Sequence, residues 1–509
     1  MNEILLGTER LDLDRLAAVA RFGARAGLNP EAINAIVKAR DLVDSWIREG
    51  KIIYGITTGF GALSERIISA KDTLRLQQNI LMSHAAGVGN ALDEETVRAV
   101  IALRVNDMAR GNSGIGLEAV ELLIELLNRA VCPVVPEKGS VGASGDLAPL
   151  AHLALVLIGS GEAFYQGQRL PGDEALTRSG LSPIQLRAAE GLALVNGTQV
   201  SCAIGALALI DALGLSKTAD IAASMSLEVL MGSRTEFDRR IHRLRPHPGQ
   251  ITAADNLERI TRNSEIVSSH KDCSRIQDAY TLRCSPQVHG ASKDAITYAQ
   301  GVLEIEMNSS TSNPLILAET REFLLGGNFH GQPLALALDF LCMAVAEFAN
   351  ISERRVERLV NPQLSGLPAF LVKNGGLNSG FMIAQYTAAA LVSENKTLCH
   401  PACVDSIPTS ANKEDHVSMS PISARKLREV VRNTEHVIAI ELLCAAQALD
   451  LFTNLKAGEG TRAAYAVIRD AVPHLEEDRV LAKDIETVTG LVKSGEILKA
   501  VENAVGPLG

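Results

Sequence analysis

The stretch Gly139–Leu150 reads Gly-Ser-Val-Gly-Ala-Ser-Gly-Asp-Leu-Ala-Pro-Leu, a glycine-rich loop that leads into an apolar segment. Three plain interpretations compete. A phosphate-binding P-loop needs a Gly-Lys-Ser/Thr ending, which is absent here. A serine nucleophile elbow needs glycine where Asp146 stands. A helix-capping turn, with Asp146 as N-cap and Pro149 in the first turn, explains the end of the stretch but not the Ala-Ser-Gly before it.

Helical periodicity dominates the sequence around this stretch. Asp93 is a suitable N-cap for a helix from Glu94 to Arg110, and Gly111 is a suitable residue just beyond its end. The next helix, after Gly116, is predicted to pack one apolar stripe into the core; that stripe comprises Val120, Leu123, Leu127 and Ala130.

Three later segments are predicted to form long helices, and convincing strands are few. The helices are expected at about Pro333 to Leu359, Gly380 to Asn395 and Ile422 to Phe452, and short strands near Ile52-Ile53 and Phe323-Leu325. We therefore predict an all-α protein with a long central bundle, whose loops carry the chemistry.

Composition narrows the class of protein. The chain has 509 residues, of which 47% are hydrophobic, 21% charged and only 4% aromatic. These proportions are ordinary for a soluble globular protein, and a core of Leu, Ala, Ile and Val suits closely packed helices. The net charge is −10, so no basic face for nucleic acid is expected, and we interpret the basic stretch Arg239–Arg245 as surface.

The sequence also predicts a cytoplasmic protein without a membrane span. The N-terminus lacks the basic and apolar regions of a signal peptide. Charged or polar residues interrupt the apolar runs Leu147–Leu157 and Pro333–Phe348, which fall short of the ~20 residues that a span needs. The eight cysteines contain no CxxC pair, so we expect reduced thiols and no metal site.

The tripeptide Ala143-Ser144-Gly145, followed by Asp-Leu-Ala-Pro-Leu, resembles the signature of the aromatic amino-acid ammonia-lyases, a family that acts on histidine, phenylalanine and tyrosine. In that family the tripeptide cyclises to 4-methylidene-imidazol-5-one (MIO). Gly145 lacks a Cβ, so its nitrogen can approach the carbonyl carbon of Ala143, and the hydroxyl of Ser144 can leave as water. The product is an electrophile, which no ordinary side chain supplies, and no external cofactor is needed.

Six further segments match the same family in order, from Tyr54 to Met419. They are Tyr54–Gly61, Ser83–Gly89, Leu194–Gln199, Gln277–Cys284, Gly326–Gly331 and Ser410–Met419. The resemblance implies an L-aspartase-like helical fold, with an N-terminal region over residues 1–200 and a bundle with a C-terminal helical region over residues 201–509. It also implies a homotetramer in which each active site is assembled from loops of more than one subunit.

The resemblance implies a role for each matched residue. Tyr54 would be the base that removes a β-proton, although a free phenol has a pKa near ~10. Asn196 would donate a hydrogen bond to the MIO oxygen, as a preorganised oxyanion donor does. Arg283 would pair with the substrate carboxylate. The resemblance also implies a catalytic role for Tyr280 and a substrate-binding role for Gln277, and both would share the face of Arg283 if the segment is helical. Phe329 would pack against MIO or substrate, and a plain core role explains it nearly as well.

Substrate choice depends on His84 and Glu414, which match the histidine-specific members of the family. A carboxylate is a sensible partner for an imidazole N–H, so we expect L-histidine to give trans-urocanate and ammonia. Thr57, Ser312 and Lys413 depart from the usual pattern, and Lys413 adjoins the ring-recognition position. Another aromatic amino acid, a betaine or thiol-imidazole analogue of histidine, or an aminomutase reaction therefore remains an alternative. A non-catalytic binding protein on the same scaffold is disfavoured by the intact tripeptide and Tyr54.

Overall fold

A computed structural model of the chain describes residues 3–7, 9–69, 72–271 and 276–509. The chain forms two compact units. Unit 1 contains residues Met1–Leu207, Gln300–Leu338 and Pro401–Arg425, and unit 2 contains Ala208–Ala299, Asp339–His400 and Lys426–Gly509. The expected division into residues 1–200 and 201–509 follows the chain order alone and stays a prediction.

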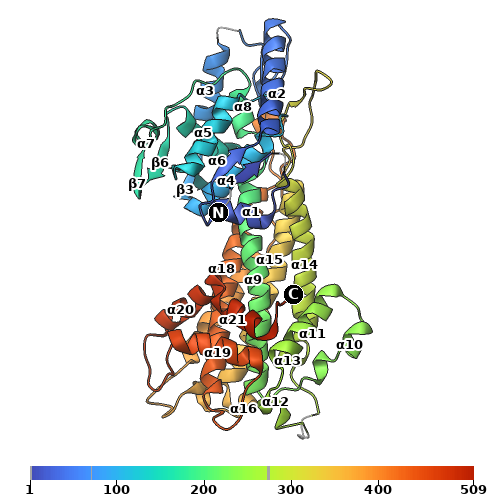
Figure 1. Ribbon diagram of the computed structural model, residues 1–509, viewed down its shortest axis with the longest axis vertical. Coiled ribbons are helices and arrows are strands. Elements are labelled where there is room, and N and C mark those ends of the chain that lie inside the picture. Colours follow the sequence, from blue (N-terminus) through green and yellow to red (C-terminus); the bar gives the residue numbers. More distant parts are fainter. Residues whose placement is uncertain (1–2, 8, 70–71, 272–275) are drawn as a thin grey trace. The chain divides into compact units, whose positions relative to one another are not determined.

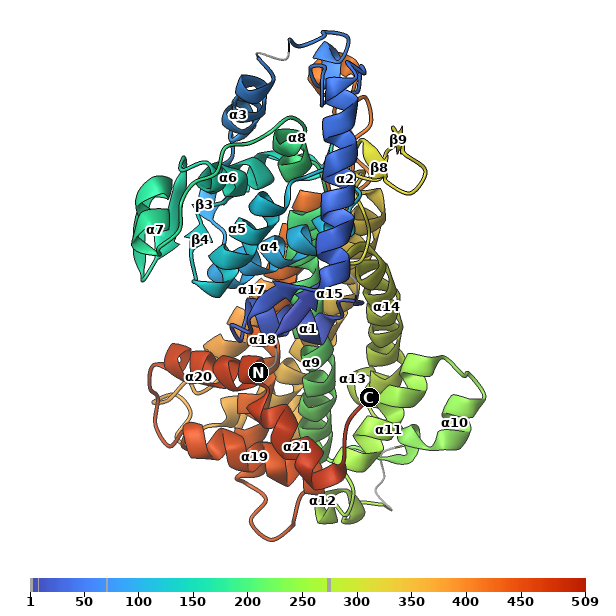
Figure 2. The ribbon, with the colours of Figure 1, turned by 45° about the horizontal axis from the view of Figure 1, so that its top comes forward.

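Helices dominate both units, as the sequence predicts (Figures 1 and 2). The helices that lie within unit 1 are α1 (Leu13–Ala20), α2 (Pro30–Arg48), α3 (Thr73–His84), α4 (Glu94–Met108), α5 (Leu117–Asn128), α6 (Leu147–Leu157), α7 (Gly172–Arg178) and α8 (Glu190–Val195). The helices that lie within unit 2 are α10 (Arg239–Arg243), α11 (Pro248–Ile260), α12 (Glu265–Ser268), α13 (Tyr280–Arg283), α16 (Pro362–Ser365), α17 (Met382–Leu398), α19 (Glu459–Ala471), α20 (Leu481–Ser494) and α21 (Glu496–Val505).

Four longer helices have residues in both units: α9 (Gln199–Val229), α14 (Ser285–Glu306), α15 (Gln332–Val360) and α18 (Ser420–Leu449). By length and composition α9 and α15 could each cross a membrane, contrary to our reading of the interrupted runs. Most of each apolar window is buried inside the structure, however, as in the core helices of a soluble protein.

The predicted helix boundaries follow local capping chemistry. The Asp93 carboxylate accepts the Thr96 N–H at 3.1 Å at the start of α4, and Gly111 beyond its end has φ +76°. The stripe on α5 is buried at Val120, Leu123 and Leu127. These contacts confirm the caps and most of the predicted buried face. The prediction is wrong for Ala130, which lies beyond the end of α5, has φ +53° and is exposed.

The strands of the described residues are short and peripheral. They form two-stranded pairs β1 (Ile4–Leu6) with β2 (Ala26–Leu28), β3 (Val88–Ala91) with β5 (Pro136–Lys138) and β8 (Leu315–Leu317) with β9 (Glu322–Leu324), and a three-stranded sheet of β4 (Cys132–Pro133), β6 (Glu162–Tyr165) and β7 (Gln168–Pro171). The expected strand at Phe323–Leu325 is confirmed for the first two residues. The expected strand at Ile52-Ile53 is wrong, because the Ile53 carbonyl accepts the N–H groups of Ile56 and Thr57 and the chain turns there.

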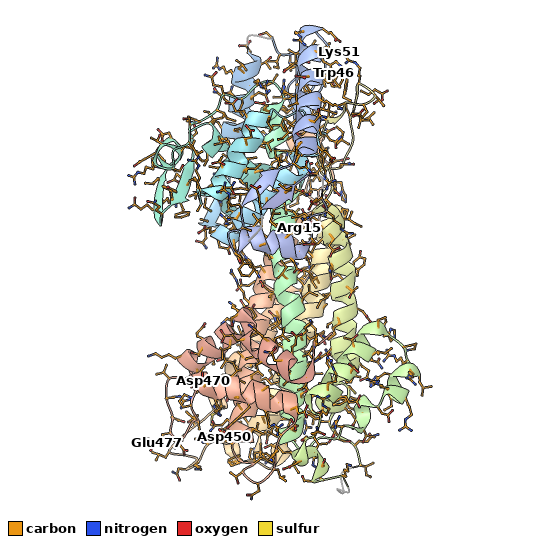
Figure 3. All side chains as sticks on the ribbon, viewed as in Figure 1. Arg15, Trp46, Lys51, Asp450, Asp470 and Glu477 are labelled. Atoms are coloured by element: carbon orange, nitrogen blue, oxygen red, sulfur yellow. The ribbon has the colours of Figure 1, made fainter. Side chains whose placement is uncertain are left out.

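Aromatic packing anchors the end of α2 in unit 1. The Trp46 ring meets the Phe323 ring edge-on, with centroids 5.5 Å apart, and Lys51 places its ammonium 5.5 Å from the Trp46 centroid (Figure 3). Trp46 belongs to a core cluster that also contains Ile53 and Ile56. This cluster holds the start of the loop that begins at Tyr54.

Candidate active site

Close backbone contacts that only glycine allows fix the conformation of the loop of residues 139–145. Gly145 has φ +71°, and a Cβ built on it would lie 2.1 Å from the Gly197 carbonyl oxygen. The next N–H, that of Asp146, donates to the same oxygen at 2.7 Å. The Ser140 hydroxyl accepts the Gly142 N–H at 3.2 Å and donates to the Gly145 carbonyl at 3.3 Å. Gly145 is therefore locked against the Asn196-Gly197 backbone.

Asn196 contacts Ser144, the middle residue of the tripeptide. It follows α8 directly and is only 2% exposed. Its Nδ2 donates to the Ser144 carbonyl oxygen at 3.1 Å, as the resemblance implies for the oxygen that would belong to the cyclised group. Its Oδ1 is buried without a partner among the described residues. An amide donor is thus fixed in place on that carbonyl.

A buried polar network lies under Gly197 and fixes it. The Arg104 guanidinium donates to Asp107 at 2.9 Å, to Gln199 at 2.7 Å and to the Ala193 carbonyl. Burial raises the pKa of Asp107, while Arg104 and Thr311 lower it. The network was not predicted from the sequence, although Gln199 belongs to a segment that matched the family.

Asp146 does not cap α6 with its side chain, which corrects our capping prediction. Its carboxylate instead accepts the Ser201 N–H at 2.8 Å and the Ser201 hydroxyl at 2.6 Å. Burial raises the pKa of Asp146 to about 6, against the lowering effect of these hydrogen bonds. The side chain therefore ties the loop to the start of α9, because tertiary hydrogen bonds outcompete the local cap.

A second segment covers the other side of the loop. Ala143 packs in an apolar cluster with Val417 and Met419. The Met419 N–H donates to the Val141 carbonyl at 2.9 Å, and the Ser418 hydroxyl donates to the Gly142 carbonyl at 3.1 Å. Residues 417–419 lie just beyond Glu414, so the same segment that positions this carboxylate also seats the loop.

Hydrogen bonds among residues 51–61 fix the conformation of the loop that begins at Tyr54. The phenol oxygen of Tyr54 accepts the Gly61 N–H at 3.3 Å. Thr57, one of the departures from the family pattern, accepts the Ile53 N–H at 2.9 Å and donates to the Lys51 carbonyl at 2.9 Å. Burial raises the pKa of Tyr54, the Gly61 hydrogen bond opposes this, and the charge of Glu414 adds to it. The phenol is therefore protonated near neutral pH.

His84 ends α3 beside an open cavity of about 830 Å³ whose lining includes Phe60 and Ser83. Burial lowers the pKa of His84, and the charge of Glu414 partly offsets that effect. One carboxylate thus acts electrostatically on both Tyr54 and His84. The structure brings these three predicted residues into one electrostatic neighbourhood.

Glu414 is fixed by a tight turn in its own loop. The Thr409 hydroxyl donates to the Glu414 carboxylate at 2.7 Å, and the backbones of the two residues pair in an antiparallel bridge. Ser410 contacts the Tyr54 loop, since its hydroxyl accepts the Ala62 N–H at 3.3 Å. The hydroxyls of Thr409 and Ser410 therefore help to hold the Glu414 loop against the loop that carries Tyr54.

Phe329 is half-buried in the loop between β9 and α15. Two residues later, Gly331 packs against Ser420, where an added Cβ would lie 2.3 Å from the hydroxyl. Ser420 in turn contacts Ser418, which holds the tripeptide loop. The role of Phe329 toward MIO or substrate stays a prediction.

Gln277, Tyr280 and Arg283 belong to unit 2, unlike the other predicted site residues. The Arg283 guanidinium lies 4.5 Å from the centroid of the exposed Tyr280 ring, and its Nε is buried without a partner among the described residues. Gln277 and Arg283 also line a cavity of about 550 Å³. The predicted common helical face is wrong for Gln277, because helix α13 begins only at Tyr280.

The geometry of unit 1 defines what this site can do. It aims an amide donor at one carbonyl of the Ala143-Ser144-Gly145 loop and holds a protonated phenol, an imidazole and a carboxylate in one electrostatic neighbourhood. Among the described residues there is no group of three His, Cys, Asp or Glu side chains suited to a metal ion. Such an arrangement fits proton transfer beside a stabilised electrophile.

The chain belongs to the aromatic amino acid lyase family, whose model matches residues 11–470. It is 55% identical to the histidine ammonia-lyase of Alkaliphilus oremlandii, over 99% of both chains. It also resembles the crystal structure of histidine ammonia-lyase from Trypanosoma cruzi, with a TM-score of 0.92 and 45% identity over 99% of this chain and 96% of that one. Tyrosine aminomutase from Streptomyces globisporus gives a TM-score of 0.94 at 37% identity over 99% of both chains. The protein is a carbon–nitrogen lyase with the helical fold of this family.

Replacing Asn196 with alanine is expected to lower kcat about 10²- to 10³-fold, because the amide is the donor aimed at the Ser144 oxygen. Substrate affinity, measured as KM, should change far less. Steady-state assays of Asn196→Ala and of the surface control Asn350→Ala check this. A normal kcat in Asn196→Ala would contradict the assigned role.

Proposed function

We propose that this protein eliminates ammonia from L-histidine to give trans-urocanate, using MIO formed from Ala143, Ser144 and Gly145. The observation that carries the proposal is the Asn196 amide on the Ser144 carbonyl, directly beside a glycine that tolerates no Cβ. The family membership and the curated relatives named histidine ammonia-lyase support the substrate.

The residues present fit the cyclised group. Gly145 is held at a positive φ with its backbone against Gly197. Because Gly145 lacks a Cβ, it has no side chain that would hinder the approach of its nitrogen in ring closure. Ser144 would lose its hydroxyl as water, and the ring oxygen would keep its Asn196 donor. The group would supply the electrophile that makes the amine a better leaving group.

The surrounding side chains have the remaining roles, which are proton transfer and substrate binding. Tyr54 accepts the β-proton of the substrate, while Glu414 and His84 receive the imidazole ring, with Glu414 accepting a ring N–H. Arg283 pairs with the carboxylate, supported by Gln277 and Tyr280, and Phe329 packs against the ring. From the resemblance to the family, we propose that loops of neighbouring subunits complete each site in a cytoplasmic homotetramer.

An ultraviolet assay of the purified protein with histidine, phenylalanine and tyrosine in parallel tests this function. Each product has a new double bond conjugated to its ring, so each absorbs differently. Urocanate from histidine alone is the expected result. Cinnamate or coumarate instead would reject the substrate, and a β-amino acid without free ammonia would reveal an aminomutase. Silence with all three would direct the search to modified histidines.

A mass spectrum of the native protein separates the lyase from a non-catalytic relative. Formation of MIO removes two water molecules, one in ring closure between Gly145 and Ala143 and one in the dehydration of Ser144. The intact mass should therefore be lower than that calculated from the sequence by two waters. An unmodified mass in folded protein would reject the enzymatic proposal.

Tyr54→Phe is expected to lower kcat about 10²- to 10⁴-fold, the usual range for losing a general base. The raised pKa of Tyr54 means that little phenolate exists near neutral pH, so kcat/KM of the unaltered protein should increase with pH toward that raised pKa. The residual rate of Tyr54→Phe should lack this rise. A pH–rate profile checks both points, and an unchanged alkaline limb in the variant would assign the limb to another group.

A further inference from the structure

Two histidines adjoin the proposed site without a role in the mechanism above. His330 directly follows Phe329, and His416 lies two residues beyond Glu414. Their rings stack, with centroids 5.3 Å apart and planes 27° apart. Side chains of this pair therefore join the loop that carries Phe329, residues 325–331, to the loop that carries Glu414, residues 409–416. All four residues belong to unit 1.

The hydrogen bonds around the pair fix its tautomers. The Gln332 N–H donates to His330 Nδ1 at 3.3 Å, so the His330 proton is on Nε2. Nε2 then donates toward His416 Nδ1 at 3.3 Å and toward the His416 carbonyl oxygen at 3.4 Å. His416 Nδ1 is therefore an acceptor, and its proton lies on Nε2. The donor direction runs from Gln332 at the start of α15 through His330 to the Glu414 loop.

Few other contacts restrain the solvent-exposed side of the loop that carries Phe329. Residues Leu324 to Asn328 are exposed, and a Cβ on Gly326 or Gly327 would touch nothing within 4 Å. The loop's inner hydrogen bonds go from Gly326 N–H to Asn313 and from Asn328 to the Ser310 carbonyl. None of these contacts reaches the segment that carries Glu414. Farther along both segments, Gly331 packs against Ser418 and Ser420. The histidine pair joins the two segments next to Phe329 and two residues beyond Glu414, so it is placed to set the separation of these two side chains.

We propose that the His330–His416 stack is a positioning pair that sets the width of the ring-binding site between Phe329 and Glu414. The inference rests on the proposed function, because it assigns ring recognition to those two residues. Neither histidine is a catalytic residue in it. Loss of the pair should loosen the grip on the imidazole and leave the electrophile and Tyr54 untouched.

Alanine and amide variants test the pair with kcat and KM measured separately. His416→Ala and His330→Ala should each raise KM for histidine about tenfold, the expected effect of losing one or two hydrogen bonds, with kcat changed less. The double variant should be little worse than either single one, because the two residues act through one contact. His416→Asn keeps an acceptor near the Nδ1 position and His330→Gln keeps a donor near Nε2, so each should recover part of the loss. His436→Ala, on the surface of α18, is the matched control.

The outcomes separate this inference from the proposed function. If the unaltered protein does not turn over histidine, the proposed function fails. If it does, and the alanine variants keep a normal KM or lose kcat alone, the positioning pair is overturned. Additive effects in the double variant would also overturn it. Native mass and circular dichroism spectra of every variant show whether ring closure and folding are intact, so that a misfolded alanine variant is replaced by its amide counterpart.

Discussion

Ser144→Ala is expected to abolish turnover while the protein still folds. Without the Ser144 hydroxyl no water can leave from that side chain, so the exocyclic methylidene cannot form. The loss should exceed about a thousandfold, since removing one donor to an oxyanion already costs ~10²–10³ and here the electrophile itself is missing. Assays with high enzyme concentration measure the residual rate.

The structure explains why the fold should survive this substitution. The contacts that seat the loop use the backbone of Val141, Gly142, Ser144 and Gly145, which alanine at position 144 leaves in place. Circular dichroism and size-exclusion chromatography should therefore match the unaltered protein. The intact mass should differ, because the waters are retained. Ser494→Ala, at the exposed end of α20, serves as the control, and near-normal turnover in Ser144→Ala would refute the MIO assignment.

Glu441→Gln is the substitution expected to destabilise unit 2 most. The Glu441 carboxylate is fully buried and accepts four hydrogen bonds from three side chains. Arg355 donates at 2.5 and 2.9 Å, and Ser226 and Ser352 donate at 2.6 Å each. The NH2 group of glutamine would face groups that themselves donate hydrogen bonds, so some of these bonds would be lost. Arg355 would also lose its counter-charge. Breaking such a pair lowers the free energy of unfolding by about 3–5 kcal/mol.

Denaturant unfolding followed by circular dichroism measures this effect. Glu429→Gln on the same helix is the matched control, since its contact with Arg432 is exposed and 3.9 Å long, and such pairs contribute about 0–1 kcal/mol. A second variant, Glu441→Leu with Arg355→Met, should recover much of the loss because no charge is left buried and unpaired. Equal stability of Glu441→Gln and the control would show that the ion pair is dispensable.

Local sequence rules predicted those features that depend on neighbours along the chain. Asp93 caps α4 because its carboxylate reaches an N–H three residues away, and the stripe on α5 is buried because its spacing matches the helical repeat. The Ala-Ser-Gly tripeptide and the Asn196 motif could be recognised in the amino-acid sequence alone. Tyr54, His84 and Glu414 could be named from their resemblance to the family, and the structure places them in one electrostatic neighbourhood.

The errors arose where distant residues compete with local preferences. Asp146 satisfies Ser201 rather than capping α6, because that residue is brought to it by the start of α9. Ile52-Ile53 has β-branched side chains, but Ile53 is drawn into a core cluster and a turn. The helix at Arg283 begins too late to include Gln277.

The sequence by itself determined most helices and predicted the residues that carry the chemistry, because capping, helical spacing and the Ala143-Ser144-Gly145 motif are local properties of the chain. Only the tertiary structure decided what surrounds them. It set the Asn196 amide on Ser144, the Arg104–Asp107 network under Gly197, and the His330–His416 stack between two loops. These contacts bring together residues that lie far apart in the chain, which no local pattern encodes. The hydrogen bonds of Arg104 with Asp107 and Gln199 are stable because burial excludes water from them.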